Sequence, residues 1–479
     1  MKRNIRHWKR KILHRQHKIK PRSQPAIVEP VPIAKFNFRK LFANLAIFAV
    51  LSLALQYAEL SRLGQETLDR GYDYLIRANF KTAVLQGEEI APVSPHLRVV
   101  LFEARSYQQS YTKGYWTPRD EVGLAVVNSL KRGARIVLVD FSFAGEAPVV
   151  MQGEQPLDGT RKYLEYLAEA AELARVNKAV ILVPVVSSAP PKGYLELLSR
   201  YRDVFRPATF EALRDGHDGK VRRLRWFSYS GEYAPILSAG LLSSLILDQQ
   251  DEALAVREAK SLLVGAQDQA KLLSPALAKA LRPEEQKASS RLIYRLLPRA
   301  VVAREFGSGS DIAKGVVWLP QQIAAANLNE PDFKGKIVLI GSDYQDNGDF
   351  HQTAFGPLAG SYILANSLNM IFTGRLIEEA KGLNLGLLVL TGLLASVLYA
   401  RFSSFWPNLF FFGFGSLSPW LSVWVFNRYG FFLDVWLPAL GVGGYNLIVS
   451  NVNWQQVIGV QGLLSKWLRR RCHRGTILM

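Results

Sequence analysis

The stretch KGKIVLIGSDYQDNGDFHQTAFGPLAGSYILANSLNMIF, residues 334–372, predicts a strand, a polar loop and a helix. The run GKIVLIG is apolar throughout and bounded by glycines, which is typical of a parallel strand buried on both faces of a sheet. The loop SDYQDNGDFHQT follows it, and residues 357–372 are apolar at helical spacing. Because open α/β sheets bind ligands at the carboxyl ends of their strands, this loop is a candidate site.

The segments before this unit predict the rest of an α/β domain. Residues 97–104, 134–143 and 179–186 are apolar runs that read as parallel strands. Residues 119–132 and 161–175 separate them with helical spacing, and the first of these helices begins after a proline. A strand, helix, strand, helix, strand order indicates a doubly wound, mostly parallel sheet.

Basic residues gather at the two ends of the chain. Residues 1–60 carry 13 Lys and Arg against 2 acidic residues, and residues 401–479 carry 7 against 1. Residues 61–400 are nearly balanced, with 39 against 37. A nucleic-acid-binding domain would carry its charge in the folded part. We therefore predict a membrane partner and no nucleic acid.

Four apolar stretches are long enough to cross the hydrocarbon core of a bilayer. They are residues 41–60, 383–400, 405–426 and 431–450. The first follows a basic leader too long for the n-region of a signal peptide, so we predict an uncleaved anchor. The positive-inside rule places both termini in the cytoplasm. The chain is thus predicted to be a multi-pass protein of a bacterial inner membrane, with its main domain in the periplasm.

The predicted organisation has five parts. They are a basic cytoplasmic tail with a Pro-rich linker (1–40), a first membrane helix (41–60), an extracytoplasmic domain (61–382), three further membrane helices (383–450) and a second basic tail (451–479). The first tail is predicted to lie on anionic lipid, with a disordered tail as the alternative. Helical spacing of apolar residues after the first span predicts that the anchor continues outward as a stalk helix. The single cysteine, Cys472, falls in the second tail, which excludes a disulfide in the main domain.

Four segments carry a resemblance when taken in order. They are GYWTPRDE with Trp116, Pro118 and Arg119; GARIVLVD, which ends at Asp140; HDGKVRR with Asp218, Gly219 and Arg222; and KGKIVLIG followed by Asp349, Thr353, Gly360 and Asn366. Together they resemble the CHASE domain of type two, an extracytoplasmic sensory module of bacterial cyclases, kinases and diguanylate cyclases. The resemblance covers roughly residues 61–380, and three membrane spans after the domain are also usual in that family.

This chain departs from the family pattern at three residues and after the last span. Glu103 stands where the family usually has aspartate at the end of the first strand, Ala354 replaces a proline expected after Thr353, and Leu364 fills a position that is often polar. The family normally carries a catalytic output domain after the last span, whereas fewer than 30 residues follow Ser450, too few for such a domain. We therefore expect the protein not to be an enzyme.

Five residues are candidates for a ligand site: Glu103, Arg119, Asp140, Asp349 and His351. The three acids lie at or just after the carboxyl ends of predicted strands, so their side chains are expected to converge on one crevice. Converging carboxylates must be paired with cations, hold a proton or bind a metal, and Arg119 is the candidate counter-charge. The alternative is that the acids cap helices or form structural ion pairs, and that His351 is a hydrogen-bonded loop residue. No motif assigns a metal, a cofactor or a catalytic residue.

Two functions fit these observations best; a third, an envelope enzyme that acts through the carboxylates, lacks a nucleophile and base pair that the sequence can name. The first is a membrane-anchored sensor or accessory signalling subunit that relays a signal through its membrane helices to a separate protein. The second is a structural or assembly factor of a bacterial envelope complex that docks partners through its periplasmic domain, and a homodimer suits either. An open polar pocket around Asp140 and Asp349 would favour sensing, whereas a crevice filled by side chains would favour assembly.

Overall fold

The structure is a computed structural model of the chain. It describes residues 38–59, 62–86, 93–103, 118–146, 150–152, 155–185, 189–210, 212–214, 218–228, 236–248, 289–306, 316–325, 333–343, 349–373, 378–379, 381–402, 405–429 and 431–433. Outside these residues lie the first predicted basic tail up to residue 37, the whole second tail, Trp116 and nearly all of the fourth predicted span.

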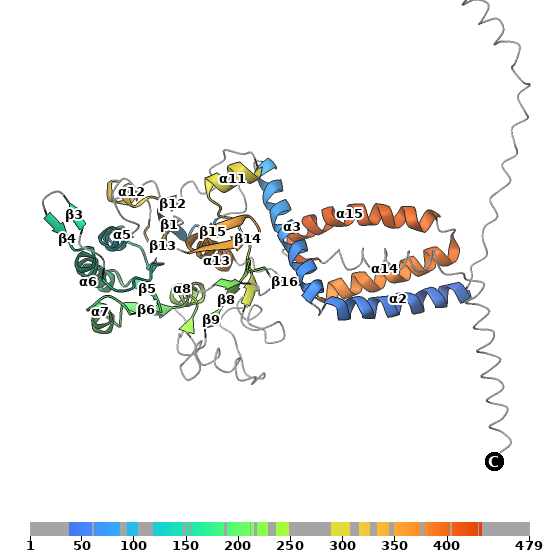
Figure 1. The fold of residues 1–479 in the computed structure, drawn as a ribbon, viewed down its shortest axis with the longest axis horizontal. Coiled ribbons are helices and arrows are strands. Elements are labelled where there is room, and N and C mark those ends of the chain that lie inside the picture. Colours follow the sequence, from blue (N-terminus) through green and yellow to red (C-terminus); the bar gives the residue numbers. More distant parts are fainter. Residues whose placement is uncertain are drawn as a thin grey trace, which may run out of the picture.

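A sheet of six strands forms the centre of the α/β domain (Figure 1). Its order is β12 (Val317–Trp318), β1 (Leu97–Phe102), β13 (Ile337–Ser342), β2 (Ile136–Val139), β5 (Val180–Pro184) and β6 (Phe205–Ala208). Every neighbouring pair in this sheet is parallel. The predicted α/β class with a mostly parallel sheet is therefore confirmed. Strand β13 comes last along the chain and lies in the middle of the sheet, where all its residues are buried.

Helices cover both faces of this sheet, because alternate side chains of each strand point to opposite sides. One face packs on α5 (Arg119–Lys131), α6 (Gly159–Asn177), α7 (Tyr194–Arg200) and α12 (Pro320–Ala325). The other packs on α3 (Arg62–Gln86), α8 (Ala239–Leu247) and α13 (Gly360–Phe372). Local capping fixes some of these helices: the Asp158 carboxylate accepts the Arg161 N–H at 3.0 Å and begins α6.

Smaller strands complete the domain. An antiparallel sheet joins β11 (Ser289–Arg291), β8 (Val221–Arg225) and β7 (Ala212–Arg214). The remaining elements are β3 (Val150–Gln152), β4 (Gln155–Leu157), β9 (Phe227–Ser228), β10 (Ile236–Leu237), α11 (Arg299–Phe306), β16 (Glu378–Glu379) and β17 (Phe431–Phe432). Val221, Leu224 and Trp226 pack into the same core as α3 and α13, so the antiparallel sheet is joined to the main one.

The helix predicted over residues 357–372 begins three residues later than expected. Gly356–Ala359 forms strand β15, which pairs with β14 (Phe350–Thr353), and helix α13 begins at Gly360. The Thr353 hydroxyl closes the hairpin, since it donates to the Gly356 carbonyl at 2.7 Å and accepts the Phe355 N–H at 3.1 Å. Gly356 has a φ of 90°, which favours glycine. A helical spacing of apolar residues does not reveal such a hairpin, because Pro357 is tolerated at an edge strand as well as near a helix start.

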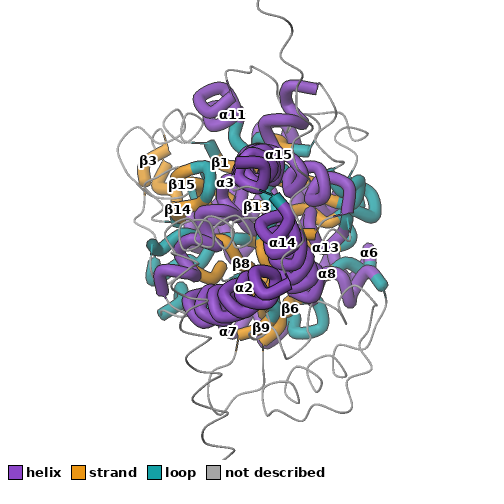
Figure 2. The backbone as a smooth tube through the Cα atoms, turned by 90° about the vertical axis from the view of Figure 1, so that its right-hand side faces the viewer, coloured by secondary structure: helices purple, strands orange, loops and turns teal. Residues whose placement is uncertain are grey.

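Three long helices, α2 (Phe38–Glu59), α14 (Lys381–Arg401) and α15 (Phe405–Tyr429), extend together from the α/β domain. Figure 2 looks toward this bundle and shows the three helices side by side. Leu383–Arg401 and Trp406–Phe426 are long and apolar enough to cross a membrane. Only 39% and 28% of these segments are buried, so most of their apolar side chains face outward, unlike those of a soluble core helix. The apolar part of α2 is shorter, Leu41–Ala54, and the count of four spans stays a prediction.

Helix α3 differs from the predicted stalk. It does not extend α2 outward but lies between the α/β domain and the bundle, at a steep angle to α2 (Figure 1). Tyr72, Leu75, Ile76 and Phe80 are buried in the same core as the central strands. Helix α3 is therefore part of the domain, and packing against the sheet decides its direction.

Candidate functional site

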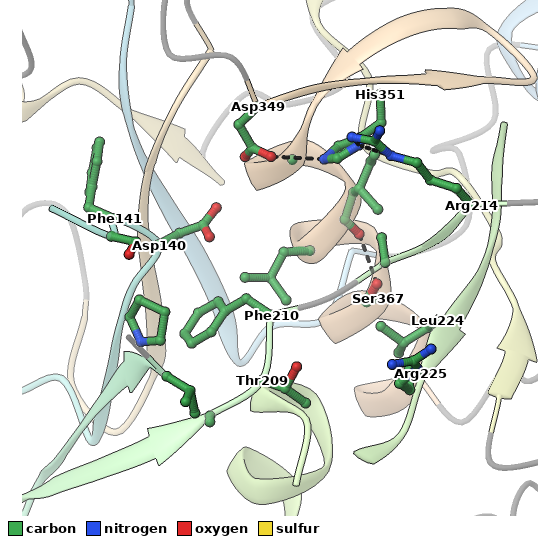
Figure 3. A pocket seen from close by; sticks show the side chains of 18 of the residues that line it. Asp140, Phe141, Thr209, Phe210, Arg214, Leu224, Arg225, Asp349, His351 and Ser367 are labelled. Carbon is green, nitrogen blue, oxygen red and sulfur yellow. Dashed lines mark hydrogen bonds and ion pairs between the residues drawn. The ribbon is translucent and has the colours of Figure 1, made fainter. Parts of the chain in front are cut away.

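A pocket of about 600 Å³ opens at the carboxyl ends of β2, β5 and β6 (Figure 3), the edge of the sheet that the sequence predicts. It is lined by residues from three sources. The main sheet supplies Asp140, Pro184, Thr209 and Phe210; the hairpin and α13 supply Asp349, His351, Ile363 and Leu364; and the antiparallel sheet supplies Arg214, Leu224 and Arg225. Polar and apolar side chains therefore share the wall.

Asp140 is held in place by the first turn of α13. The Ser361 hydroxyl donates to Asp140 Oδ2 at 2.7 Å and accepts the backbone N–H of Ser342 at 3.0 Å. Gly341 permits this approach, since a Cβ at that position would overlap the Ser361 hydroxyl. The end of β13, the start of α13 and the end of β2 are thus joined through one hydroxyl group.

The surroundings of Asp140 favour its neutral form. Burial raises the pKa of Asp140 to about 8, and the neighbouring Asp349 carboxylate adds to this rise, whereas the Ser361 hydrogen bond opposes it. At pH 7 Asp140 is therefore mostly protonated and presents a hydrogen-bond donor. A positively charged group placed beside it would favour the ionised form.

Asp349, His351 and Arg214 form a hydrogen-bonded row along the pocket (Figure 3). Arg214 Nε and Nη2 lie 3.2 Å and 2.9 Å from His351 Nδ1. Because a guanidinium only donates, Nδ1 is the acceptor and the ring hydrogen sits on Nε2. That nitrogen lies 2.8 Å from Asp349 Oδ1. The orientation of the His351 ring is therefore set at both nitrogens.

Asp349 also lies against the first residue of α13. A Cβ on Gly360 would overlap the Asp349 carboxylate, and the Gly360 N–H donates to the Asp349 backbone carbonyl at 2.8 Å. The positive end of the helix dipole stabilises a carboxylate in this position. Glycine at the helix start is thus required for the carboxylate to face the pocket.

The structure places the two other predicted site residues away from this pocket. Arg119 is 4% exposed and donates to the carbonyls of Ala144 and Gly145 at 3.1 Å and 2.7 Å. Its guanidinium also lies over the Phe143 ring at 4.8 Å, so it holds the loop that carries this pocket residue. Glu103 follows β1, which β13 separates from β2, and it is not among the residues that line the pocket.

Sequence reasoning missed two residues that complete the site. Arg214, and not Arg119, supplies the positive charge next to His351. It lies on the short strand β7, which has no apolar run, but the Asp218–Gly219 turn after it marks a hairpin and was the available signal. Ser361 follows Gly360, the first residue of α13. Its contact with Asp140 appears only when α13 is packed against β13, so no sequence signal marks it.

Among the residues that the structure describes, no three His, Cys, Asp or Glu side chains come together as a metal site. The pocket holds two acids, Asp140 and Asp349, and the His351 ring joins Asp349 to Arg214. It therefore offers a positively charged donor, negatively charged acceptors and neutral hydrogen-bonding groups. It can bind a small polar molecule by directed hydrogen bonds.

Gly341→Ala should destabilise the protein by about 1–3 kcal/mol, since a methyl group would force Ser361 and α13 away from the central strand. The measurement is urea unfolding of the full-length protein in detergent, followed by tryptophan fluorescence. The control is Gly159→Ala at the start of α6, where the nearest atom would be 3.9 Å from the added Cβ. Equal stability of the two variants would contradict the close approach of Ser361 to β13.

The family model for the CHASE2 domain matches residues 43–398, well over half of the chain. No curated protein and no solved structure matches the chain.

Proposed function

Because the chain belongs to the CHASE2 domain family, whose domain is an extracytoplasmic sensory module, we propose that it is a membrane-anchored sensor. Its α/β domain binds a small polar solute and relays this event through the membrane helices to a separate signalling protein. The observation that carries the proposal is the open pocket at Asp140 and Asp349, with its polar groups already oriented. A domain used only for envelope assembly would more naturally have this crevice filled.

Binding without catalysis is the activity that this pocket supports. His351 and Asp349 resemble part of a catalytic triad, but the second ring nitrogen of His351 faces Arg214 and not a hydroxyl or thiol. The hydroxyl of Ser361 is engaged by Asp140 and the Ser342 N–H. We therefore propose a receptor and not an enzyme.

A buried ion-pair network supports a route from the pocket to helix α3. Arg222 on β8 is 1% exposed, and its Nε and Nη2 each lie 2.8 Å from an oxygen of Asp73 on α3. One turn away, Arg291 Nη1 on β11 lies 3.1 Å from Asp69 Oδ1. Helix α3 is thus bound to the antiparallel sheet by charge-assisted hydrogen bonds shielded from water.

The same strand reaches the pocket. Leu224 and Arg225 on β8 line the cavity, only a few residues after Arg222. A ligand that shifts β8 would therefore displace the partners of Asp73 and Asp69 on α3. This continuity supports a mechanical link, whose strength is limited by the ligand's preference for one of the two positions.

Helix α3 in turn contacts the membrane bundle. It packs against both α2 and α15. Val423 and Phe426 of α15 belong to the same apolar core as Tyr72 and Ile76 of α3. A movement of α3 would thus change the relative positions of the first membrane helix and the later ones.

The outward-facing apolar side chains of α14 and α15 support a membrane location. We propose the inner membrane of a bacterium, four spans, both termini in the cytoplasm and the α/β domain in the periplasm. Contact with lipid and pairing of two copies through the spans complete this proposal. The partner that reads the movement is a cyclase, a kinase or another signalling protein.

The proposal is tested by hydrogen–deuterium exchange of the full-length protein in lipid nanodiscs. The probe is the low-molecular-weight fraction of the bacterium's growth medium. We expect slower exchange in residues 349–364 together with altered exchange in α3 and α2, because a bound solute orders the pocket and shifts β8. Asp349→Asn should abolish both changes, whereas Arg175→Gln, at an exposed ion pair with Asp203, should retain them. Protection of the pocket without a change in α3 would overturn the relay, and no protection at all would overturn the sensor.

A further inference from the structure

The charged groups of the pocket have a spacing that narrows the chemistry of the ligand. Asp349 and Arg214 bind the two opposite nitrogens of one ring, His351. A negative and a positive group therefore lie on the same wall, separated by one imidazole ring and a hydrogen bond on each side of it (Figure 3). A ligand that bridges the same two groups needs an ammonium and a carboxylate about as close together as the two ring nitrogens, and an α-amino acid carries both on a single carbon.

These groups retain hydrogen-bonding capacity. A carboxylate has about four acceptor sites and a guanidinium five N–H donors, whereas His351 engages one oxygen of Asp349 and two nitrogens of Arg214. Among the described residues, Arg214 has no carboxylate partner, and its side chain is exposed. Ser361 engages one oxygen of Asp140 and leaves the other for the pocket.

Apolar side chains also line the cavity. They are Phe210, Leu224, Ile363 and Leu364, which share the lining with Ser142, Thr209, Arg225 and Ser367. This surface offers an apolar ligand group the free energy of leaving water. The wall therefore combines a place for a positive group, a place for a negative group and several apolar side chains.

Ligands with only one charge match this wall less well. A simple amine would leave Arg214 without a carboxylate. A simple carboxylate would bring a second negative charge close to Asp349, and like charges in a partly enclosed site repel. A neutral apolar molecule would leave both charged groups unpaired.

We propose that the solute is a small zwitterion of the α-amino-acid type, with its ammonium group at Asp349 and Asp140, its carboxylate at Arg214 and an apolar side chain against Phe210 and Leu364. This assignment rests on the proposed function and names the ligand class of the same pocket. This binding mode also predicts that a proton is released when the ligand binds. An ammonium group beside Asp140 favours the ionised carboxylate, so binding near neutral pH releases a proton.

The test is isothermal titration calorimetry of the full-length protein in nanodiscs with the natural L-amino acids. L-leucine is compared with isopentylamine, which lacks the carboxylate, and with 4-methylpentanoate, which lacks the ammonium group. We expect an apolar amino acid to bind with proton release, seen as a dependence of the measured heat on the buffer. Each single-charge analogue should bind about tenfold or more weakly.

Two variants assign the charges separately. Arg214→Gln should weaken the amino acid about tenfold or more and bring its affinity close to that of the matching amine. Asp349→Asn should also weaken the amino acid about tenfold or more, and should bring its affinity close to that of the matching carboxylate. Arg175→Gln, which removes an exposed guanidinium from the distant helix α6, should leave all affinities unchanged. A merely structural role of Arg214 would weaken every ligand alike.

The inference is overturned if no amino acid binds, or if either single-charge analogue binds as tightly as the amino acid. The growth-medium fraction distinguishes the two proposals in that event. Protection of residues 349–364 by this fraction would show that the sensor stands and the ligand class is wrong. If neither the fraction nor an amino acid changes the exchange, both proposals fall.

Discussion

Arg222→Met should destabilise the protein by about 3–5 kcal/mol, because breaking a buried ion pair leaves uncompensated charge away from water. Arg222 is almost fully buried, and Asp73 and Asp218 both accept hydrogen bonds from its guanidinium at 2.7–3.0 Å. Asp69 lies 3.9 Å from the same group. Methionine fills much of the arginine volume, so the loss reports on charge and hydrogen bonding more than on a cavity.

Urea unfolding of the full-length protein in detergent measures this loss. Arg175→Met is the matched control, because its ion pair with Asp203 is exposed and such pairs contribute about 0–1 kcal/mol. Combining Arg222→Met with Asp73→Leu should recover part of the stability, since it removes one of the unpaired charges. If Arg222→Met lowers the free energy of unfolding no more than the control does, this network does not hold α3. The proposed route from the pocket to α3 would then lack its main contact.

Asp140→Asn should remove a large pH dependence of stability. The pKa of Asp140 is raised from 3.8 to about 8, so between these values the folded protein holds a proton that the unfolded chain does not. Stability from this group is present at low pH and falls as the pH rises through about 8. The total change is on the order of several kcal/mol, which only the wild-type protein shows.

Thermal unfolding between pH 4 and pH 8 in steps checks this expectation. The charged and titratable groups that line the pocket around Asp140 are Asp349 before β14, His351 on β14, Arg214 on β7 and Arg225 on β8, and they remain in the variant. Asp203→Asn is the control, because hydrogen bonds from Arg175 hold the pKa of Asp203 at about 2 and it stays ionised throughout this range. Parallel curves for the wild type and Asp140→Asn would show that the surroundings of Asp140 do not raise its pKa.

The sequence by itself determined the elements and the edge of the sheet where the site lies. Apolar runs identified β1, β2, β5 and β13, and helical spacing identified α5 and α6, because these patterns report which side chains of a local segment are buried. Asp140 and Asp349 follow two of these strands, and the carboxyl ends of parallel strands meet at one edge. Their meeting in one pocket therefore followed from positions along the chain.

Only the tertiary structure decided which charged groups meet. Arg214 and His351 are separated by 137 positions, and no local pattern relates them. Their contact depends on the packing of the β7–β8 sheet beside the β14–β15 hairpin. In the same way, Arg119 has the expected helix but turns to the Ala144–Gly145 loop, and α3 has the expected periodicity but lies across the bundle. Local sequence specifies which side of an element is buried, whereas the partner of that side depends on sheet order and on contacts between distant segments.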